Sequence, residues 1–79
     1  MSDRKVSLRR SPTSGNWILE APHPQLGVPQ PFVIDGTFSF RTLAQAARFL
    51  GDRGHLLVPN KRDGRRYLTN GRGEYLTAT

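Results

Sequence analysis

The side chains of this sequence best suited to proton transfer are two histidines, His23 and His55. A general base needs a group that orients it, and a metal site needs several ligands at regular spacing. His23 lies between two prolines, and neither histidine has a carboxylate or a second histidine at such spacing. The sequence has no cysteine, which excludes thiolate catalysis, disulfides and cysteine-based metal sites. We therefore predict no enzyme activity, no catalytic residue, no metal and no cofactor.

Binding chemistry is favoured instead by LLVPNKRDGRRYLTNGRGEYL, residues 56–76, which sets Asp63-Gly64 inside a run of cations. Asp-Gly suits a two-residue type I′ hairpin turn, which would place Arg62 opposite Arg65 and Lys61 opposite Arg66. Like charges directly across a strand pair are destabilising, so an anionic partner would offset that cost. Basic tips also protect edge strands from aggregation, and Pro59 indicates an edge, so a purely protective role stays open.

The predicted partner-binding residues are cations of this tip and of the other chain reversals, with one tyrosine. They are Arg9, Arg10, Lys61, Arg62, Arg65, Arg66, Tyr67 and Arg72. Stacking on nucleic-acid bases needs exposed rings beside cations, and only Tyr67 and Tyr75 lie close to the tip in sequence. Because so small a chain needs its large side chains inside, the other aromatic residues are expected in the core.

The charge of the chain narrows the class of partner. Its 79 residues hold 12 Lys and Arg against 6 Asp and Glu, a net charge of +6, and the pI is near 11.2. Such a balance favours nucleic acid, an acidic protein face or an anionic membrane surface. The longest apolar runs are far shorter than the roughly 20 residues that span a bilayer, and no apolar signal region follows Arg4-Lys5. We expect a cytoplasmic protein without a membrane partner.

The elements that position these residues can be predicted from periodicity. Residues 6–10 and 17–21 flank a cluster of turn formers and predict a first hairpin. Four prolines make residues 22–31 a stiff, Pro-rich surface loop in this prediction. Residues 32–34 are expected to form a third strand, closed by Asp35-Gly36.

From Ser39 the hydrophobic period becomes helical. Ser39 is the expected N-cap and Gly51 the expected C-terminal stop. The apolar positions at helical spacing are Phe40, Leu43, Ala44, Ala47 and Leu50. The polar positions Arg41, Gln45 and Arg48 are too few for a DNA-recognition helix, which indicates a helix that packs on the sheet.

Three strands are expected after Gly54, at residues 56–62, 65–70 and 74–77. A four-residue loop, 70–73, would place Leu68 opposite Tyr75 and Tyr67 opposite Leu76. Residues 1–79 are thus predicted to form one α+β domain, a small antiparallel β-sheet with one α-helix packed on it. The predicted order is β-β-β-α-β-β-β.

The stretches VIDGTFSF and LAQAARFLG, within residues 33–51, resemble the strand, Gly, Phe-Ser and Ala-Ala helix pattern of small DNA-associated modules in bacterial restriction and modification proteins. In size and organisation the chain also resembles the small inhibitor proteins of bacteriophages, anti-CRISPR proteins among them. That second resemblance implies a viral protein in the host cytoplasm that binds a nucleic-acid-handling complex stoichiometrically and blocks it. Cations such as Arg62, Arg65 and Arg66 would dock on acidic patches of the target.

Three further possibilities stay open from the sequence. The charge is compatible with a ribosomal or other assembly component that is wedged in RNA. The same cations could contact the phosphates of DNA or RNA in a free-standing nucleic-acid-binding module. A homodimer could form by pairing of edge strands.

Overall fold

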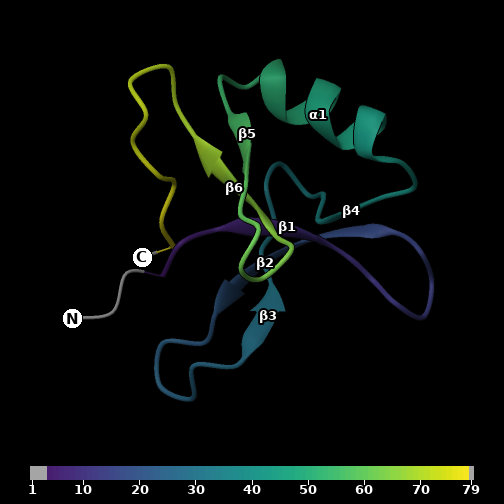
Figure 1. Ribbon diagram of the computed structural model, residues 1–79, viewed down its shortest axis with the longest axis vertical. Coiled ribbons are helices and arrows are strands. Elements are labelled where there is room, and N and C mark those ends of the chain that lie inside the picture. The colour runs from purple at the N-terminus through teal and green to yellow at the C-terminus, as the bar shows by residue number, and fades with distance from the viewer. Residues whose placement is uncertain (1–3, 79) are drawn as a thin grey trace.

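The first predicted hairpin forms the centre of the sheet in the computed structural model, which describes residues 4–78 (Figure 1). Strand β1, Ser7–Arg10, pairs antiparallel with β2, Trp17–Pro22. Leu8 faces Leu19 in this register, and both side chains are fully buried. The strand order is β3-β2-β1-β6-β5, and β4 pairs with β2 off this path. The predicted fold class, one helix packed on a small antiparallel sheet, is confirmed.

The Pro-rich segment contributes an edge strand, which the sequence prediction missed. Strand β3, Pro29–Pro31, pairs with the second half of β2, so the loop is confined to residues 23–28. Proline lacks a backbone donor, and an edge strand tolerates this because one side of its backbone has no partner strand. The prediction of a loop over the whole of residues 22–31 is therefore wrong for its first residue, Pro22, which belongs to β2, and for its last three residues.

The expected third strand at residues 32–34 is absent from the described sheet. Ile34 and Thr37 instead exchange two 2.9 Å backbone hydrogen bonds across Asp35-Gly36. Both turn residues have positive φ, 49° at Asp35 and 76° at Gly36, as a type I′ turn requires. The place beside Trp17 and Ile18 is taken by β4, Ser39–Phe40.

The helix begins three residues later than predicted. Ser39 cannot cap it because its backbone pairs with Ile18 in β4. Thr42 is the N-cap of α1, Leu43–Gly51, and its hydroxyl accepts a 3.1 Å hydrogen bond from the Gln45 amide. Asp52, not Gly51, occupies the C-terminal cap position.

The late start of α1 changes which alanine is buried. Ala46 and Leu50 are fully buried, whereas Ala44 and Ala47, which were predicted to face the core, are exposed. Phe40 is buried as predicted, but from β4 rather than from the helix. The core joins α1 to the central strands through the fully or almost fully buried residues Val6, Leu8, Leu19, Ala21, Phe40, Ala46, Leu50 and Leu68.

The chain after the helix forms one hairpin and a short return segment. Strand β5, Leu56–Pro59, pairs with β6, Arg66–Thr69, and β6 also pairs with β1. The third expected strand, residues 74–77, makes only isolated bridges, Thr69 to Tyr75 and Lys5 to Thr77. Tyr75 thus faces Thr69 rather than Leu68, and this one-residue change of register moves its side chain to the other face of the sheet.

Alternation along the strands gives the sheet a second, polar face opposite the helix. We call this the open face; its central members are Ser7, Arg9, Glu20, Val58, Tyr67 and Thr69. Arg65 and Tyr75 lie at its ends. Among the described residues, no helix is long and apolar enough to cross a membrane.

Candidate binding surface

The basic hairpin tip does not have the two-residue turn predicted for Asp63-Gly64. Pro59 pairs with Arg66, and the Asn60 amide donates to the Arg65 carbonyl at 2.8 Å, so residues 61–64 form a four-residue loop. The predicted pairs Arg62–Arg65 and Lys61–Arg66 are therefore wrong. This register avoids like charges directly across the strand pair, because Arg65 faces Asn60 and Arg66 faces Pro59.

Side chains of the loop fix its conformation. Asn60 Oδ1 accepts from the Arg62 amide and Asp63 Oδ1 from the Arg65 amide, both at 2.9 Å. Such short-range bonds to the backbone replace strand pairing in the turn, and Gly64 supplies the positive φ of 72°. Lys61 and Arg62 are exposed, and within residues 4–78 their side chains make no hydrogen bond or ion pair. The tip presents two free cations on a fixed loop.

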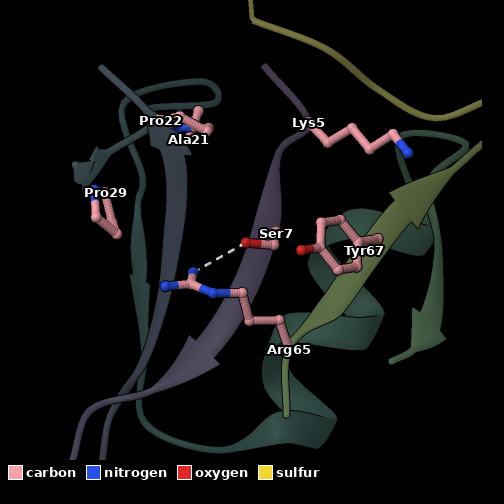
Figure 2. Close-up of a pocket in the computed structure, with 7 residues that line it drawn as sticks. All are labelled: Lys5, Ser7, Ala21, Pro22, Pro29, Arg65 and Tyr67. Atoms are coloured by element: carbon pink, nitrogen blue, oxygen red, sulfur yellow. Dashed lines mark hydrogen bonds between the residues drawn. The ribbon is translucent and has the colours of Figure 1, made fainter. Parts of the chain in front are cut away.

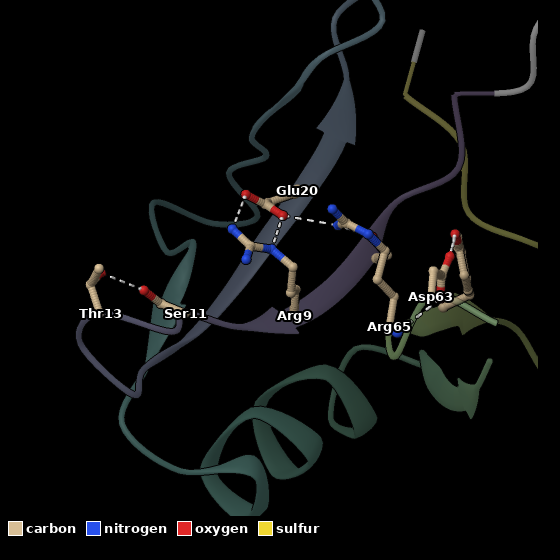
Figure 3. A network of polar contacts seen from close by, with 8 residues as sticks. Arg9, Ser11, Thr13, Glu20, Asp63 and Arg65 are labelled. Carbon is tan, nitrogen blue, oxygen red and sulfur yellow. Dashed lines mark hydrogen bonds and ion pairs between the residues drawn. The ribbon is translucent and has the colours of Figure 1, made fainter. Parts of the chain in front are cut away.

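Arg9 and Arg65, both predicted as partner contacts, converge on one carboxylate of the open face (Figure 3). Glu20 Oε1 accepts from Arg9 Nε at 3.0 Å and from Arg65 Nη1 at 2.9 Å. The same Arg65 Nη1 donates to Ser7 Oγ at 3.1 Å. Because Glu20 is only 7% exposed, these contacts compensate a nearly buried charge.

The network determines the ionisation of Glu20. Burial by itself would raise the pKa of its carboxyl. Hydrogen bonds from Arg9 and Arg65, with the charges of both guanidinium groups, outweigh burial and hold that pKa below its ordinary value. The hydrogen bond between Arg9 and Glu20 also raises the pKa of Arg9. Glu20 is therefore an ionised link between two strands and the hairpin tip.

Tyr67 is held by a contact at the tip rather than left free for stacking. Its hydroxyl donates to Asp63 Oδ2 at 2.6 Å, which lowers the pKa of Asp63 and raises that of Tyr67. The tyrosine ring is half-buried and meets the Tyr75 ring edge to face, with centroids 6.1 Å apart. The Tyr67 contact fixes the tip against the open face.

The other predicted cations lie apart from this network. The Arg66 guanidinium lies 5.0 Å from the centre of the Trp17 ring on the helix side of the sheet, and Arg10 is the cross-strand neighbour of Trp17. Arg72 is exposed in the loop after β6, at the other end of that strand from Lys61 and Arg62. The eight predicted residues thus do not form one continuous patch.

Lys5 belongs to the open face although the sequence prediction omitted it. Its ammonium lies 4.4 Å from the centre of the Tyr75 ring. The bridge from Lys5 to Thr77 brings the start of the chain beside its end. The predicted strand began at Val6. If it had been extended back by one residue, its alternation would have placed Lys5 on the same face as Ser7 and Arg9.

A small pocket opens on this face between β2, β3 and β6 (Figure 2). Its volume is about 120 Å³, and its walls include Lys5, Ser7, Pro22, Pro29, Arg65 and Tyr67. Pro22 and Pro29 lie on the side opposite Tyr67, and the Arg65 guanidinium reaches between them toward Ser7. The pocket is well below the 300–1,000 Å³ typical of drug-sized ligand sites, so it suits a single small group.

His23, one of the two histidines considered for proton transfer, contacts the backbone of its own loop. His23 Nδ1 accepts hydrogen bonds from the Gln25 and Leu26 amides, both at 3.1 Å, and so fixes the loop after β2. Within residues 4–78, no three His, Asp or Glu side chains lie close enough to hold a metal ion.

Comparison of the chain with protein-family models, curated proteins and solved structures gives no match.

Proposed function

We propose that this protein is a non-enzymatic, stoichiometric binding protein that blocks a nucleic-acid-handling protein complex. It docks on an acidic surface of that complex through the hairpin tip and the adjoining open face. The class of target rests on the resemblance to small bacteriophage inhibitors, which also gives the bacterial host cytoplasm as the place of action.

The observation that carries the proposal is the pairing of two free cations with exposed apolar side chains. Lys61 and Arg62 project from the fixed loop, and on the adjacent strand Leu56 is 54% and Val58 39% exposed. Protein interfaces combine buried apolar side chains with charged groups that set orientation. A loop that is already rigid loses little conformational entropy on binding.

The two carboxylates of this surface, Glu20 and Asp63, do not prevent an anionic partner from binding, because both already have hydrogen-bond donors. Glu20 is bound by Arg9 and Arg65, and Asp63 accepts hydrogen bonds from Tyr67 and from the Arg65 amide. Glu20 is therefore compensated by two cations, both oxygens of Asp63 already have donors, and an approaching carboxylate meets the free cations Lys61 and Arg62.

A protein partner fits these contacts better than nucleic acid does. Protein–DNA interfaces are more polar and more positively charged than a surface that exposes Leu56, Val58 and Tyr75.

The proposal is tested by affinity capture from a nuclease-treated bacterial lysate. We expect the wild-type protein to retain a nucleic-acid-handling complex that the double variant Lys61→Glu/Arg62→Glu loses. The matched control is Arg41→Glu/Arg48→Glu, which reverses two exposed cations at the helix and should retain the complex. Both variants should fold, because exposed charges contribute little to stability. Equal capture by all three proteins would contradict the proposal.

A nucleic-acid-binding module is the second candidate, and the Arg66–Trp17 contact beside Arg10 favours it. Stacking aromatic rings next to cations is the usual arrangement for binding single strands. Binding to labelled duplex DNA, single-stranded DNA and RNA over a salt series distinguishes the two. Tight binding that weakens steeply with salt would support this second candidate.

A further inference from the structure

We infer that the pocket beside Arg65 receives one carboxylate side chain, an Asp or Glu, of the partner protein. This inference rests on the proposed function, because it specifies the group with which an acidic partner surface engages the open face. It adds a binding site within the open face to the contacts of the tip.

Arg65 supplies the charge and unused donors. Its side chain is only 18% exposed, and Nη1 makes both of its side-chain hydrogen bonds, to Glu20 and Ser7. Within the described residues, Nε and Nη2 donate to no acceptor. A guanidinium has five N–H donors in a planar fork that matches the two oxygens of a carboxylate. Arg65 is therefore held in place by Nη1 while other nitrogens remain free.

Ser7 supplies a second, buried donor at the same pocket. It is only 3% exposed, and its oxygen accepts from Arg65. A hydroxyl also carries one proton to donate, and within residues 4–78 that proton has no acceptor. Ser7 Oγ already has Arg65 as a partner, and its proton can be donated to an acceptor oxygen that enters the pocket. Tyr67 cannot serve in this way, because its hydroxyl proton is bound by Asp63.

The walls and size of the pocket select a short side chain over a phosphodiester. Pro22 and Pro29 line the side opposite Tyr67 and offer apolar contact to methylene groups. The volume of about 120 Å³ leaves no room for a nucleotide. A phosphodiester also carries a sugar on each side, whereas a carboxylate enters at the end of a single chain.

The charge around the pocket is favourable in spite of Glu20. That carboxylate is shared by Arg9 and Arg65, so the three groups together carry a net charge of +1. Lys5 lines the same pocket and adds one positive charge, and Asp63, which is bonded to Tyr67 and to the Arg65 amide, adds one negative charge, so the sum stays at +1. An incoming carboxylate neutralises the cluster and adds a second carboxylate acceptor for Arg65.

The inference is tested by NMR titration of the full-length, ¹⁵N-labelled protein with N-acetyl-glutamate amide. We expect saturable shifts at the Ser7 and Tyr67 amides and at the Arg65 Nε–H signal. The neutral analogue N-acetyl-glutamine amide, of matched size, should produce no saturable shift. Because no partner protein is needed, failure of this titration would refute the pocket alone, whereas failure of the capture experiment would refute the proposed function.

Three variants identify the site. Ser7→Ala and Arg65→Lys should each weaken binding of the glutamate analogue at least fivefold. Arg41→Gln, which removes an exposed cation beside the helix and outside the pocket, should leave the affinity unchanged. If one pocket variant does not fold, the other tests the same donors. Shifts that do not saturate, shifts that centre on Lys61 and Arg62, or tighter binding of dimethyl phosphate than of the glutamate analogue would each overturn the inference.

Discussion

Arg65 Nη1 lies 2.9 Å from Glu20 Oε1, so a cation at the end of the hairpin tip is bound to the centre of the sheet. Arg9 reaches the same carboxylate from β1. The contact joins residues 45 positions apart in the chain and determines how the tip lies on the open face. Arg9 and Arg65 thus have a structural contact within the fold, whereas the side chains of Lys61 and Arg62 make no hydrogen bond or ion pair within residues 4–78.

Replacing Glu20 with Gln should destabilise the protein by about 1–3 kcal/mol, because two partly buried guanidinium groups lose a charged acceptor. The urea unfolding midpoint measures this change. Glu74→Gln is the matched control, since Glu74 is exposed and, within residues 4–78, its side chain accepts only from Asn70. A midpoint for Glu20→Gln equal to that of the control would show that the network does not stabilise the fold.

Stability should fall on acidification in a manner that depends on Glu20. The folded-state pKa of this carboxyl lies below its ordinary value of 4.5, so its contribution is complete above that pH and is lost as pH falls through the folded-state pKa. Between pH 6 and about pH 3, the thermal unfolding temperature should therefore fall more steeply for the wild-type protein than for Glu20→Gln. Parallel curves for the two proteins would contradict the depressed pKa.

Truncation of Leu50 tests the position of the helix on the sheet. Leu50 is fully buried, so Leu50→Ala should cost about 2–5 kcal/mol. Ala47→Ser, on the exposed side of the same helix, should change the free energy of unfolding by less than about 0.5 kcal/mol. Similar effects of the two substitutions would show that the buried side of α1 is misassigned.

The start of the helix can be tested with two hydroxyl residues. Thr42→Ala should destabilise the protein by about 1 kcal/mol, because the Gln45 amide loses its acceptor. Ser39→Ala should have a much smaller effect, since this exposed residue lies in β4. A larger loss for Ser39→Ala, measured by chemical unfolding, would support the earlier helix start predicted from sequence.

Local patterns predicted the fold where one interaction dominates. The alternation around residues 11–16 gave the central hairpin, and helical spacing gave α1 to within a few residues. Elsewhere, pairing between distant segments overrides the local pattern. Ser39 pairs with β2 as part of β4 and so does not cap the helix, and Pro29–Pro31 pair with β2 in spite of the prolines.

The candidate site was only partly predictable for the same reason. Composition identified a basic tip, but the four-residue loop depends on side-chain acceptors at Asn60 and Asp63 that compete with the Asp-Gly turn. Strand order brings Arg9 and Arg65 into ion pairs with Glu20 and places the Lys5 ammonium over the Tyr75 ring. The predicted hairpin placed Arg9 and Glu20 on neighbouring strands, but no spacing within the sequence indicates that β6, which follows Arg65, pairs with β1.

The central claim is that the free cations of the tip bind an acidic protein surface. Its most direct test is titration calorimetry of the captured, nucleic-acid-free partner with the wild-type protein and with Lys61→Glu/Arg62→Glu. We predict one-to-one binding by wild type and an affinity at least tenfold lower, about 1.4 kcal/mol, for the variant. Equal affinities for the two proteins, or the lack of any protein that wild type retains and the variant loses, would contradict the claim.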